Sequence, residues 1–266
     1  MKKLRLALIG KDVSLSDSKK IHEFILKQWN IECDYRLISL KKEELDGVVK
    51  ELLVSCDGFN VTIPYKLDVM EYMKEIVGEA KEFGSVNTVV CGTATGYNTD
   101  GVGFMQMLYS AGISVEGKRV LILGGGGAAR SCAVALKKSG AKVFMYQRSR
   151  DKLIKTCQEL SVIAVENVTA GYDILINATG VGMHDSVGRS PVQEGVFIGA
   201  EKAIDLIYNP EKTEFLRLAE SQGVGILNGW AMLFYQAYYS DCYYLNRSPN
   251  KEEAARFYEK YIKTVD

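Results

Sequence analysis

The sequence of 266 residues lacks several features that would each point to a particular class of protein. It has only two histidines, His22 and His184, so a structural zinc site or a Ser-His-Asp triad would depend on one of them. Its 33 basic and 33 acidic side chains cancel, so the composition does not favour a nucleic-acid partner. No apolar run approaches the length of about 20 residues that spans a bilayer, which predicts a soluble protein without a membrane partner. We expect both histidines to have packing or surface roles.

The six cysteines are scattered, with no CxxC pair and no histidine at ligand spacing, so no metal site is expected. Their mostly apolar surroundings suit buried free thiols in a reducing compartment, which predicts a cytoplasmic protein. The N-terminal MKKLRLALIG resembles the start of a signal peptide, but its apolar run ends at Gly10 without a small-residue cleavage site, so we expect a first strand. We therefore expect the binding partner to be a small-molecule substrate. The sequence does not distinguish a monomer from a homodimer.

Strand and helix patterns alternate along almost the whole chain, which is typical of a mostly parallel α/β fold. NTVVCGTATGY, residues 87–97, differs and predicts a hairpin or a strand pair at the edge of a sheet. We place a domain boundary at NTDG, residues 98–101. The expected strands are Arg5–Ile9, Glu32–Leu40, Gly58–Ile63, Arg119–Leu123, Lys142–Tyr146, Tyr172–Asn177 and Lys202–Ile207; the expected helices are Ser18–Trp29, Lys42–Ser55, Pro64–Val77, Ala128–Ser139 and Thr213–Gln222, with two more amphipathic helices near the C-terminus.

The most specific local signal is KRVLILGGGGAARSCAVALKKSG, which predicts a buried strand, a glycine-rich turn and a helix. Gly124, Gly126 and Ala129 match G-x-G-x-x-[GA], where small residues allow a tight turn, close approach of backbone to a pyrophosphate, and packing of helix on strand. The helix N-terminus would then face the phosphates. The alternative is a glycine-rich turn that only packs. The expected dinucleotide-binding residues of this loop are Gly124, Gly125, Gly126, Gly127, Ala128 and Ala129.

The segment KVFMYQRSRDK indicates which dinucleotide is bound. An NAD site carries Asp or Glu at the end of this strand, where the sequence has Tyr146 and Gln147. A guanidinium such as that of Arg148 can instead bind a 2′-phosphate with two hydrogen bonds. We therefore predict NADP, the alternative being a solvated basic loop. The residues expected to hold this part of the cofactor are Gln147, Arg148, Ser149 and Lys152.

NVTIPYK, residues 60–66, contains the candidate proton donor. Pro64 suits the first position of a helix, which would place Lys66 in the first turn, where the helix dipole disfavours a cation. A lysine in that positive potential gives up its proton more readily, so Lys66 could protonate the oxygen of a ketone that is being reduced. Asp100 in NTDG begins the next helix, and a plain N-cap and a catalytic role are both compatible with that position.

These motifs, taken in order, resemble those of the quinate/shikimate dehydrogenase family. The resemblance covers nearly the whole chain: Ser16-Asp17-Ser18 is followed by NVTIPYK, GSVNT and YNTDG, then by GGGGAAR, QRSRDK, INATGVGM, DLIYNPEKT and NGWAMLFYQA. It implies a two-domain α/β enzyme that reduces 3-dehydroshikimate to shikimate with NADPH in aromatic amino-acid biosynthesis. The substrate domain would comprise residues 1–100 and 229–266, and the Rossmann-type NADP-binding domain residues 101–228.

The resemblance also assigns roles to residues. Lys66 and Asp100 would be the catalytic pair, and Thr179 and Gly229 would add to the cofactor site. The implied substrate-binding residues are Ser16, Ser18, Thr62, Asn87, Tyr208 and Gln236.

Four of the substrate-binding residues also have an ordinary structural alternative: helix capping for Ser16 and Ser18, a turn for Asn87 and an exposed helix face for Gln236. The chain departs from the family pattern at Leu15, Lys19, Gln147 and Gly180. These departures leave open a quinate or broader polyol-acid dehydrogenase that also uses NAD. A homologue that senses the metabolite without converting it is a further alternative, although it would have no need of a proton donor.

Overall fold

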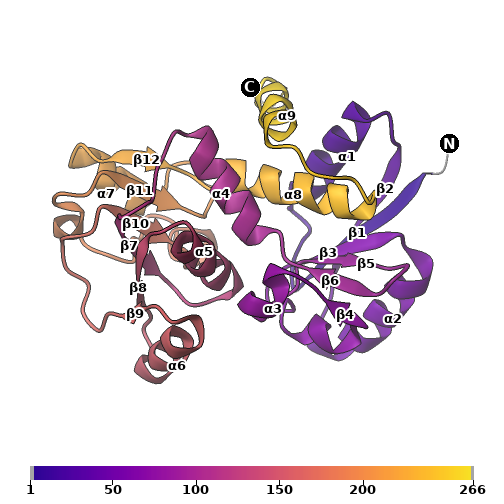
Figure 1. Cartoon of the computed structure of the whole chain (residues 1–266), viewed down its shortest axis with the longest axis horizontal. Coiled ribbons are helices and arrows are strands. Elements are labelled where there is room, and N and C mark those ends of the chain that lie inside the picture. Colours follow the sequence, from indigo (N-terminus) through magenta and orange to yellow (C-terminus); the bar gives the residue numbers. More distant parts are fainter. Residues whose placement is uncertain (1–2, 265–266) are drawn as a thin grey trace. The chain divides into compact units, whose positions relative to one another are not determined.

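The computed structural model describes residues 3–264, and the chain divides into two compact units (Figure 1). Unit 1 takes the chain up to Ser110 and resumes at Leu233, and unit 2 is Ala111–Met232. The helix that follows NTDG therefore belongs to unit 1, whereas we had placed the boundary before it.

Unit 1 is built on a mixed six-stranded sheet in the order β2-β1-β3-β5-β6-β4. Strand β1 is parallel to β2 and β3, and β5 is antiparallel to both β3 and β6, which confirms the hairpin expected in residues 87–97. The hairpin does not lie at the edge of the sheet as expected, because β4 pairs with β6 and forms the edge. The strands are β1 (Leu4–Gly10), β2 (Cys33–Ser39), β3 (Gly58–Val61), β4 (Glu75–Ile76), β5 (Thr88–Val90) and β6 (Thr95–Tyr97).

Helices cover both faces of this sheet (Figure 1). Leu45, Val49 and Leu52 recur at helical spacing and pack α2 on one face, against strand residues such as Phe59. Leu26 of α1 lies on the other face, together with side chains of α8. The helices are α1 (Ser18–Gln28), α2 (Leu45–Ser55), α3 (Glu79–Phe83), α4 (Asp100–Ser110), α8 (Trp230–Tyr244, shared with unit 2) and α9 (Lys251–Ile262), and short 3-10 helices include η1 (Lys42–Glu44) and η2 (Asp68–Tyr72).

A buried histidine joins α1 to α8. Nδ1 of His22 lies 2.6 Å from Oδ1 of Asp241, and both side chains are fully buried. The imidazole stacks on Tyr35 at 4.6 Å between ring centroids. Burial raises the pKa of Asp241, and the adjacent His22 partly offsets this rise. His22 therefore has a packing role in the core of unit 1, while His184 lies exposed in unit 2.

Unit 2 is an all-parallel sheet in the order β12-β11-β10-β7-β8-β9. Read from β9, this is the doubly wound order 3-2-1-4-5-6 of dinucleotide-binding folds, in which the chain changes direction between the first and fourth strands. The strands are β7 (Arg119–Leu123), β8 (Lys142–Tyr146), β9 (Ile163–Ala164), β10 (Ile174–Asn177), β11 (Lys202–Asp205) and β12 (Gly225–Leu227).

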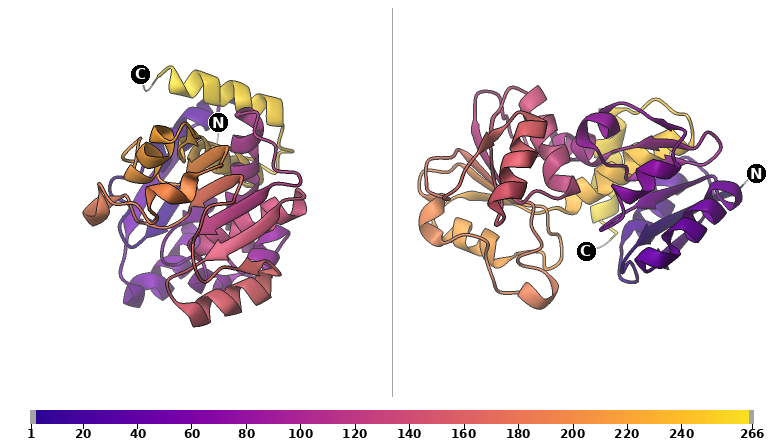
Figure 2. Two further views of the ribbon diagram at one scale, coloured as in Figure 1. Left: turned by 90° about the vertical axis from the view of Figure 1, so that its left-hand side faces the viewer. Right: turned by 90° about the horizontal axis from the view of Figure 1, so that it is seen from below.

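The central strands of unit 2 are apolar because both of their faces are covered. In β7, Leu121 and Leu123 point to the side of α7 (Glu214–Ser221), while Val120 and Ile122 are buried toward the other face. Helices α5 (Gly127–Lys138) and α6 (Arg150–Leu160) lie on that other face, and Figure 2 shows the two faces from further directions. The helix after the glycine loop is thus where the sequence predicts it.

Within residues 3–264, no helix combines the length and hydrophobicity that crossing a bilayer requires.

Candidate active site

The candidate catalytic pair is formed in unit 1. Nζ of Lys66 lies 2.6 Å from Oδ2 of Asp100, and their side chains are 15% and 6% exposed. Asp100 is the first residue of α4, and its backbone N–H donates to Oδ1 of Asn98 at 2.9 Å. The carboxylate of Asp100 therefore pairs with Lys66, while the side chain of Asn98 accepts the hydrogen bond from the backbone N–H at the start of α4.

The segment around Lys66 is not the helix that we predicted for Pro64–Val77. An α-helix would bond the N–H of Met70 to the carbonyl of Lys66, but Met70 bonds to Leu67 instead. The carbonyl of Lys66 accepts from the N–H of Val86 at 2.8 Å, so a tertiary bond competes with the helical one. The segment forms turns followed by η2 and β4, and the Ile63-Pro64 peptide is cis. The helix-dipole argument for Lys66 is therefore wrong, and the lysine owes its position to Val86 and Asp100.

Asn87 holds the second oxygen of Asp100. Its Nδ2 donates to Oδ1 of Asp100 at 2.8 Å and to Oγ1 of Thr99 at 3.0 Å. Its Oδ1 accepts from the N–H of Thr99 at 2.9 Å and from Oγ1 of Thr88 at 2.8 Å. These bonds orient the amide so that its donor end faces the carboxylate. The Asn87 side chain thus stabilises the local turn through Thr99 and also holds the carboxylate of Asp100 in place.

A hydroxyl of α8 continues this network, and the sequence analysis gave it no role. Oγ of Ser240 lies 2.7 Å from Oγ1 of Thr88 and 3.2 Å from Oγ1 of Thr99, and it donates to the carbonyl of Gln236. Nδ2 of Asn60 also donates to Oγ of Ser240 at 3.2 Å. Ser240 lies four residues after Gln236 on one helix face, but that spacing does not reveal its partners Thr88 and Thr99.

The other predicted substrate residues of unit 1 lie on two loops and on α8. Oγ of Ser16 donates to Oγ of Ser18 at 3.0 Å, and Ser18 is the first residue of α1 after an Asp17 cap, so Ser18 is not the N-cap. The N–H of Thr62 bonds to the carbonyl of Ile9, which places the end of β3 beside that of β1.

Gln236 lies on α8, close to Gly103 of α4. A Cβ at Gly103 would come within 2.7 Å of the backbone nitrogen of Gln236. The approach of these two helices therefore requires glycine at position 103.

In unit 2, the glycine loop lies at the carboxyl ends of the central strands. The N–H of Gly124 bonds to the carbonyl of Tyr146, and that of Ala178 bonds to the carbonyl of Leu123, both at 2.9 Å. The φ of Gly124 is 115°, and a Cβ there would lie 2.8 Å from the carbonyl oxygen of Ala178, so only glycine fits. This is the switch point between β7 and β10, where open α/β sheets bind their ligands.

The residues of this loop fit a dinucleotide. Gly126 precedes α5, and a Cβ there would meet nothing within 4 Å, which leaves room for a pyrophosphate. Ala129 is fully buried between helix and sheet, as the motif requires. A Cβ at Gly125 would overlap the amide of Gln147, whose buried Nε2 has no hydrogen-bond partner among residues 3–264. That spare donor is suited to an oxygen of the cofactor.

The basic residues that follow β8 differ in how they are engaged. Arg148, Ser149 and Lys152 are exposed around the start of α6, where Ser149 occupies the N-cap position. Nε of Arg150 donates to Glu166 at 2.8 Å. No ion pair is found for Arg148 in the part of the chain that the structure describes, so Arg148 is the arginine available to a 2′-phosphate.

Thr179 lies on the other side of the switch point, directly after β10. Its N–H and Oγ1 both donate to Oδ1 of Asn177, at 3.1 and 2.6 Å. Nδ2 of Asn177 donates to Oδ2 of Asp205 at 3.0 Å, and Oγ1 of Thr213 donates to the same oxygen at 2.6 Å. Burial raises the pKa of Asp205 to about 6, although these hydrogen bonds act in the opposite direction. The loops after two neighbouring strands are thus connected through one buried carboxyl.

Tyr208 and Gly229 also lie in unit 2. The ring of Tyr208 stacks on Trp230 with 5.2 Å between centroids, and the N–H of Gly229 bonds to the carbonyl of Ile207 at 3.1 Å. A Cβ at Gly229 would overlap the carbonyl of Leu206, so only glycine fits at this position. Tyr208 is therefore the one predicted substrate residue that belongs to unit 2, and the others belong to unit 1.

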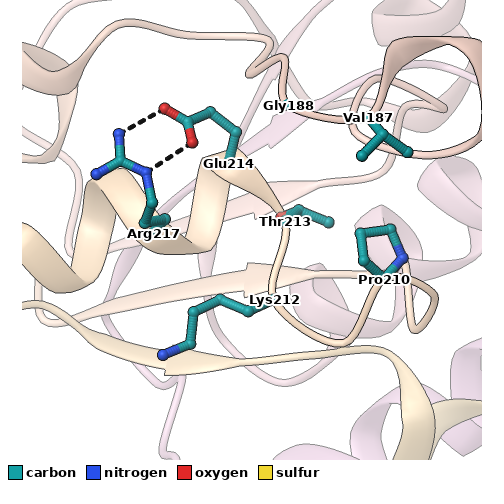
Figure 3. A pocket seen from close by; sticks show the side chains of 7 residues that line it. All are labelled: Val187, Gly188, Pro210, Lys212, Thr213, Glu214 and Arg217. Carbon is teal, nitrogen blue, oxygen red and sulfur yellow. Dashed lines mark hydrogen bonds and ion pairs between the residues drawn. The ribbon is translucent and has the colours of Figure 1, made fainter.

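A surface hollow of 220 Å³ lies at the start of α7 (Figure 3). Its charged side chains pair within the unit: Arg217 binds Glu214 at 2.6 and 2.7 Å, and Lys212 binds Glu220 at 2.9 Å. Its lining contains none of the predicted site residues, and we assign it no ligand. Within residues 3–264, no group of three or more His, Cys, Asp or Glu side chains could hold a metal ion.

Comparison with known proteins places this arrangement in a family. A family model described as the shikimate dehydrogenase substrate binding domain matches residues 8–89. A shikimate dehydrogenase (NADP(+)) of Caldicellulosiruptor bescii is 38% identical over 264 residues, which cover 92% of each chain. The chain belongs to the shikimate dehydrogenase family.

Crystal structures of shikimate dehydrogenases share the fold. That of shikimate dehydrogenase 1 from Peptoclostridium difficile has a TM-score of 0.88 and is 33% identical, with 97% of each chain covered. That of shikimate 5-dehydrogenase from Thermus thermophilus, in complex with NADP(H) and shikimate, also has a TM-score of 0.88, is 31% identical, and covers 97% of this chain and 99% of that one. The predicted family and the two-domain α/β fold are confirmed.

Proposed function

We propose that the chain catalyses the reversible reduction of 3-dehydroshikimate to shikimate with NADPH, a step of aromatic amino-acid biosynthesis. The observation that carries the proposal is the Lys66–Asp100 pair, a proton donor and its counter-ion held at 2.6 Å in a largely buried position. The names of the relatives supply the substrate and the cofactor.

In this reaction the cofactor supplies a hydride to the carbonyl carbon. Lys66 donates a proton from Nζ to the carbonyl oxygen as negative charge develops there. Asp100 stabilises the ammonium before transfer and orients the adjacent hydroxyl of the substrate. Asn87 keeps the carboxylate in place through its 2.8 Å hydrogen bond, so the pair does not have to reorganise during turnover.

We assign substrate binding mainly to unit 1 and cofactor binding to unit 2. The match of the substrate-binding-domain model to residues 8–89 supports this division. The groups proposed to contact the hydroxyls and carboxylate of the substrate are Ser16, Ser18, Thr62, Asn87 and Gln236, with Tyr208 contributed by unit 2. The groups proposed to hold NADP are residues 124–129, Gln147, Arg148, Ser149, Lys152, Thr179 and Gly229.

The departures from the family pattern leave room for these roles. Leu15 and Lys19 are exposed beside Ser16 and Ser18 rather than wedged between them and the core. A Cβ at Gly180 would meet nothing within 4 Å, so the serine that is common in the family at this position would also fit there. We propose that the enzyme acts in the cytoplasm, where its six free cysteines would stay reduced, as a monomer or a homodimer.

The test is to follow NADPH oxidation with 3-dehydroshikimate for the native protein, Lys66→Ala and Lys42→Ala. Lys42 is a matched control, because it also pairs with an aspartate, Asp68, but on the exposed surface. We expect Lys66→Ala to lower kcat by about 10²–10⁴ while both ligands still bind, and Lys42→Ala to leave the rate unchanged.

Equal rates for native protein and Lys66→Ala would contradict the catalytic role. Turnover of quinate in preference to shikimate, or with NADH as readily as with NADPH, would favour the broader dehydrogenase. Tight binding of both ligands without turnover would favour a metabolite sensor.

A further inference from the structure

Asp205 is a buried carboxylate for which the reaction above has no use. It is fully buried at the end of β11, and Asn177 occupies the equivalent register at the end of β10. The carboxylate accepts three hydrogen bonds, from Oγ1 of Thr213 at 2.6 Å and from Nδ2 of Asn177 and the N–H of Ile207 at 3.0 Å each. A charge in this position is costly, because burial alone disfavours the ionised form.

The carboxylate determines how the Asn177 amide is turned. Because Nδ2 of Asn177 faces Asp205, its Oδ1 faces the opposite way and accepts both donors of Thr179. Oγ1 of Thr179 then accepts from the N–H of Val181 at 3.1 Å, and the carbonyl of Val181 accepts from Nδ2 of Asn177. The loop that follows β10 is therefore closed on itself through an amide whose orientation depends on Asp205.

This loop belongs to the second half of the doubly wound sheet. In such folds each half binds one mononucleotide of the cofactor, and here the half with Arg148 is the one suited to the adenosine 2′-phosphate. Thr179 follows the first strand of the other half, which leaves it to the nicotinamide mononucleotide. Loss of the Asp205 charge would thus affect one half of the cofactor and spare the other.

We propose that Asp205 is a positioning residue that, through Asn177, sets the Thr179 loop for the nicotinamide half of NADP, and that cofactor affinity depends on its ionisation. The proposal rests on the NADP site proposed above. All three neighbours donate to the carboxylate, so a proton on Asp205 would remove the negative charge that strengthens these hydrogen bonds and would turn one acceptor position into a donor. The pKa of Asp205, raised by burial to about 6, places this change just below neutral pH.

The charged side chains next to Thr213 in the sequence are paired with other charged groups and do not shift the pKa of Asp205. Glu214 pairs with Arg217 and Lys212 pairs with Glu220, and Figure 3 shows the first of these pairs. Within residues 3–264, the interactions that shift the pKa of Asp205 come from burial and from uncharged donors.

The test compares two ligands by titration calorimetry of the full chain between pH 5 and pH 8. NADP⁺ occupies both halves of the site, whereas adenosine 2′-monophosphate occupies only the adenosine half and carries the same titrating 2′-phosphate with no second phosphate monoester. If binding of the nicotinamide half needs ionised Asp205, the Kd of NADP⁺ should rise about tenfold more than that of the monophosphate from pH 7.5 to pH 5.

Two variants separate positioning from simple folding. Asp205→Asn should weaken NADP⁺ binding at pH 7.5 by about tenfold or more, abolish the extra pH dependence, and leave the affinity for adenosine 2′-monophosphate unchanged. Its melting temperature should stay within a few degrees of that of the native protein, because a costly buried charge has been removed. Asp173→Asn is the matched control: this carboxylate accepts from the N–H of Arg119 at 2.7 Å, at the opposite end of the same sheet, and its loss should change neither affinity.

Parallel pH profiles for the two ligands would overturn the proposal, as would an equal loss of both affinities in Asp205→Asn. If Asp205→Asn does not fold, the comparison of the two ligands on the native protein decides alone. Failure of the native protein to bind either ligand would refute the NADP site itself, a result distinct from a failure at Asp205.

Discussion

The buried Asp205 should make unit 2 less stable at neutral pH than at mildly acidic pH. Its pKa rises from 3.8 to about 6 on folding, a shift of about 2 units, which corresponds to roughly 3 kcal/mol. Between these two values the folded state binds a proton that the unfolded state has lost. The contribution of Asp205 to the free energy of unfolding therefore falls as pH rises through this window, and the full cost is present above pH 6.

Urea unfolding of the native protein and Asp205→Asn from pH 4 to pH 7.5 would measure this contribution. Trp230 lies in unit 2, stacked on Tyr208, and becomes its specific fluorescent reporter when Trp29, the other tryptophan, is changed to phenylalanine in both proteins. The hydrogen bonds lost in Asp205→Asn add an offset that does not vary with pH. The stability of the variant relative to the native protein should therefore rise by about 2.5 kcal/mol from pH 4 to pH 7.5, because a small part of the full difference lies below pH 4. A difference that stays constant across this range would refute the reasoning.

Two further predictions concern the cofactor site and the core. Arg148→Ala should raise the KM for NADPH by about 10- to 100-fold and leave the KM for NADH unchanged. Arg150→Ala should have a much smaller effect, because the guanidinium of Arg150 already binds Glu166. Steady-state kinetics with both cofactors would check this, and equal effects of the two variants would count against Arg148. Asp241→Leu should lower the free energy of unfolding by about 3–5 kcal/mol, because His22 is left without its partner in the core. Adding His22→Phe to this variant should restore most of the lost stability. If urea unfolding shows no such recovery, the loss of stability does not come from the His22–Asp241 pair.

The strands and helices that have strong apolar patterns could be predicted from the sequence, because local pattern and tertiary packing agree there. Arg119–Leu123 and Lys142–Tyr146 have the predicted bounds, and the helix of the glycine loop begins one residue earlier than expected. The helix predicted to follow NVTIP does not form, because the carbonyl of Lys66 bonds to Val86, a partner that no local rule reveals.

The candidate site was predictable only in part, for a related reason. Lys66, Asn87 and Asp100 could be named from motifs, and the structure brings these three together. Ser240 and Asp241 could not, because a polar residue on a buried helix face is recognised as part of a network only when its partners are known. Their partners lie more than 100 residues away in the chain.

The interruption of unit 1 by unit 2 has a consequence for biosynthesis. All of unit 2 emerges from the ribosome before residue 233, so unit 2 can fold while unit 1 still lacks most of α8 and all of α9. The serine that joins Thr88 to Thr99 and the aspartate that pairs with His22 both arrive with α8. The nascent chain should therefore acquire its cofactor-binding unit first, and the proposed catalytic pair, Lys66 and Asp100, should reach its final arrangement only after α8 has emerged from the ribosome.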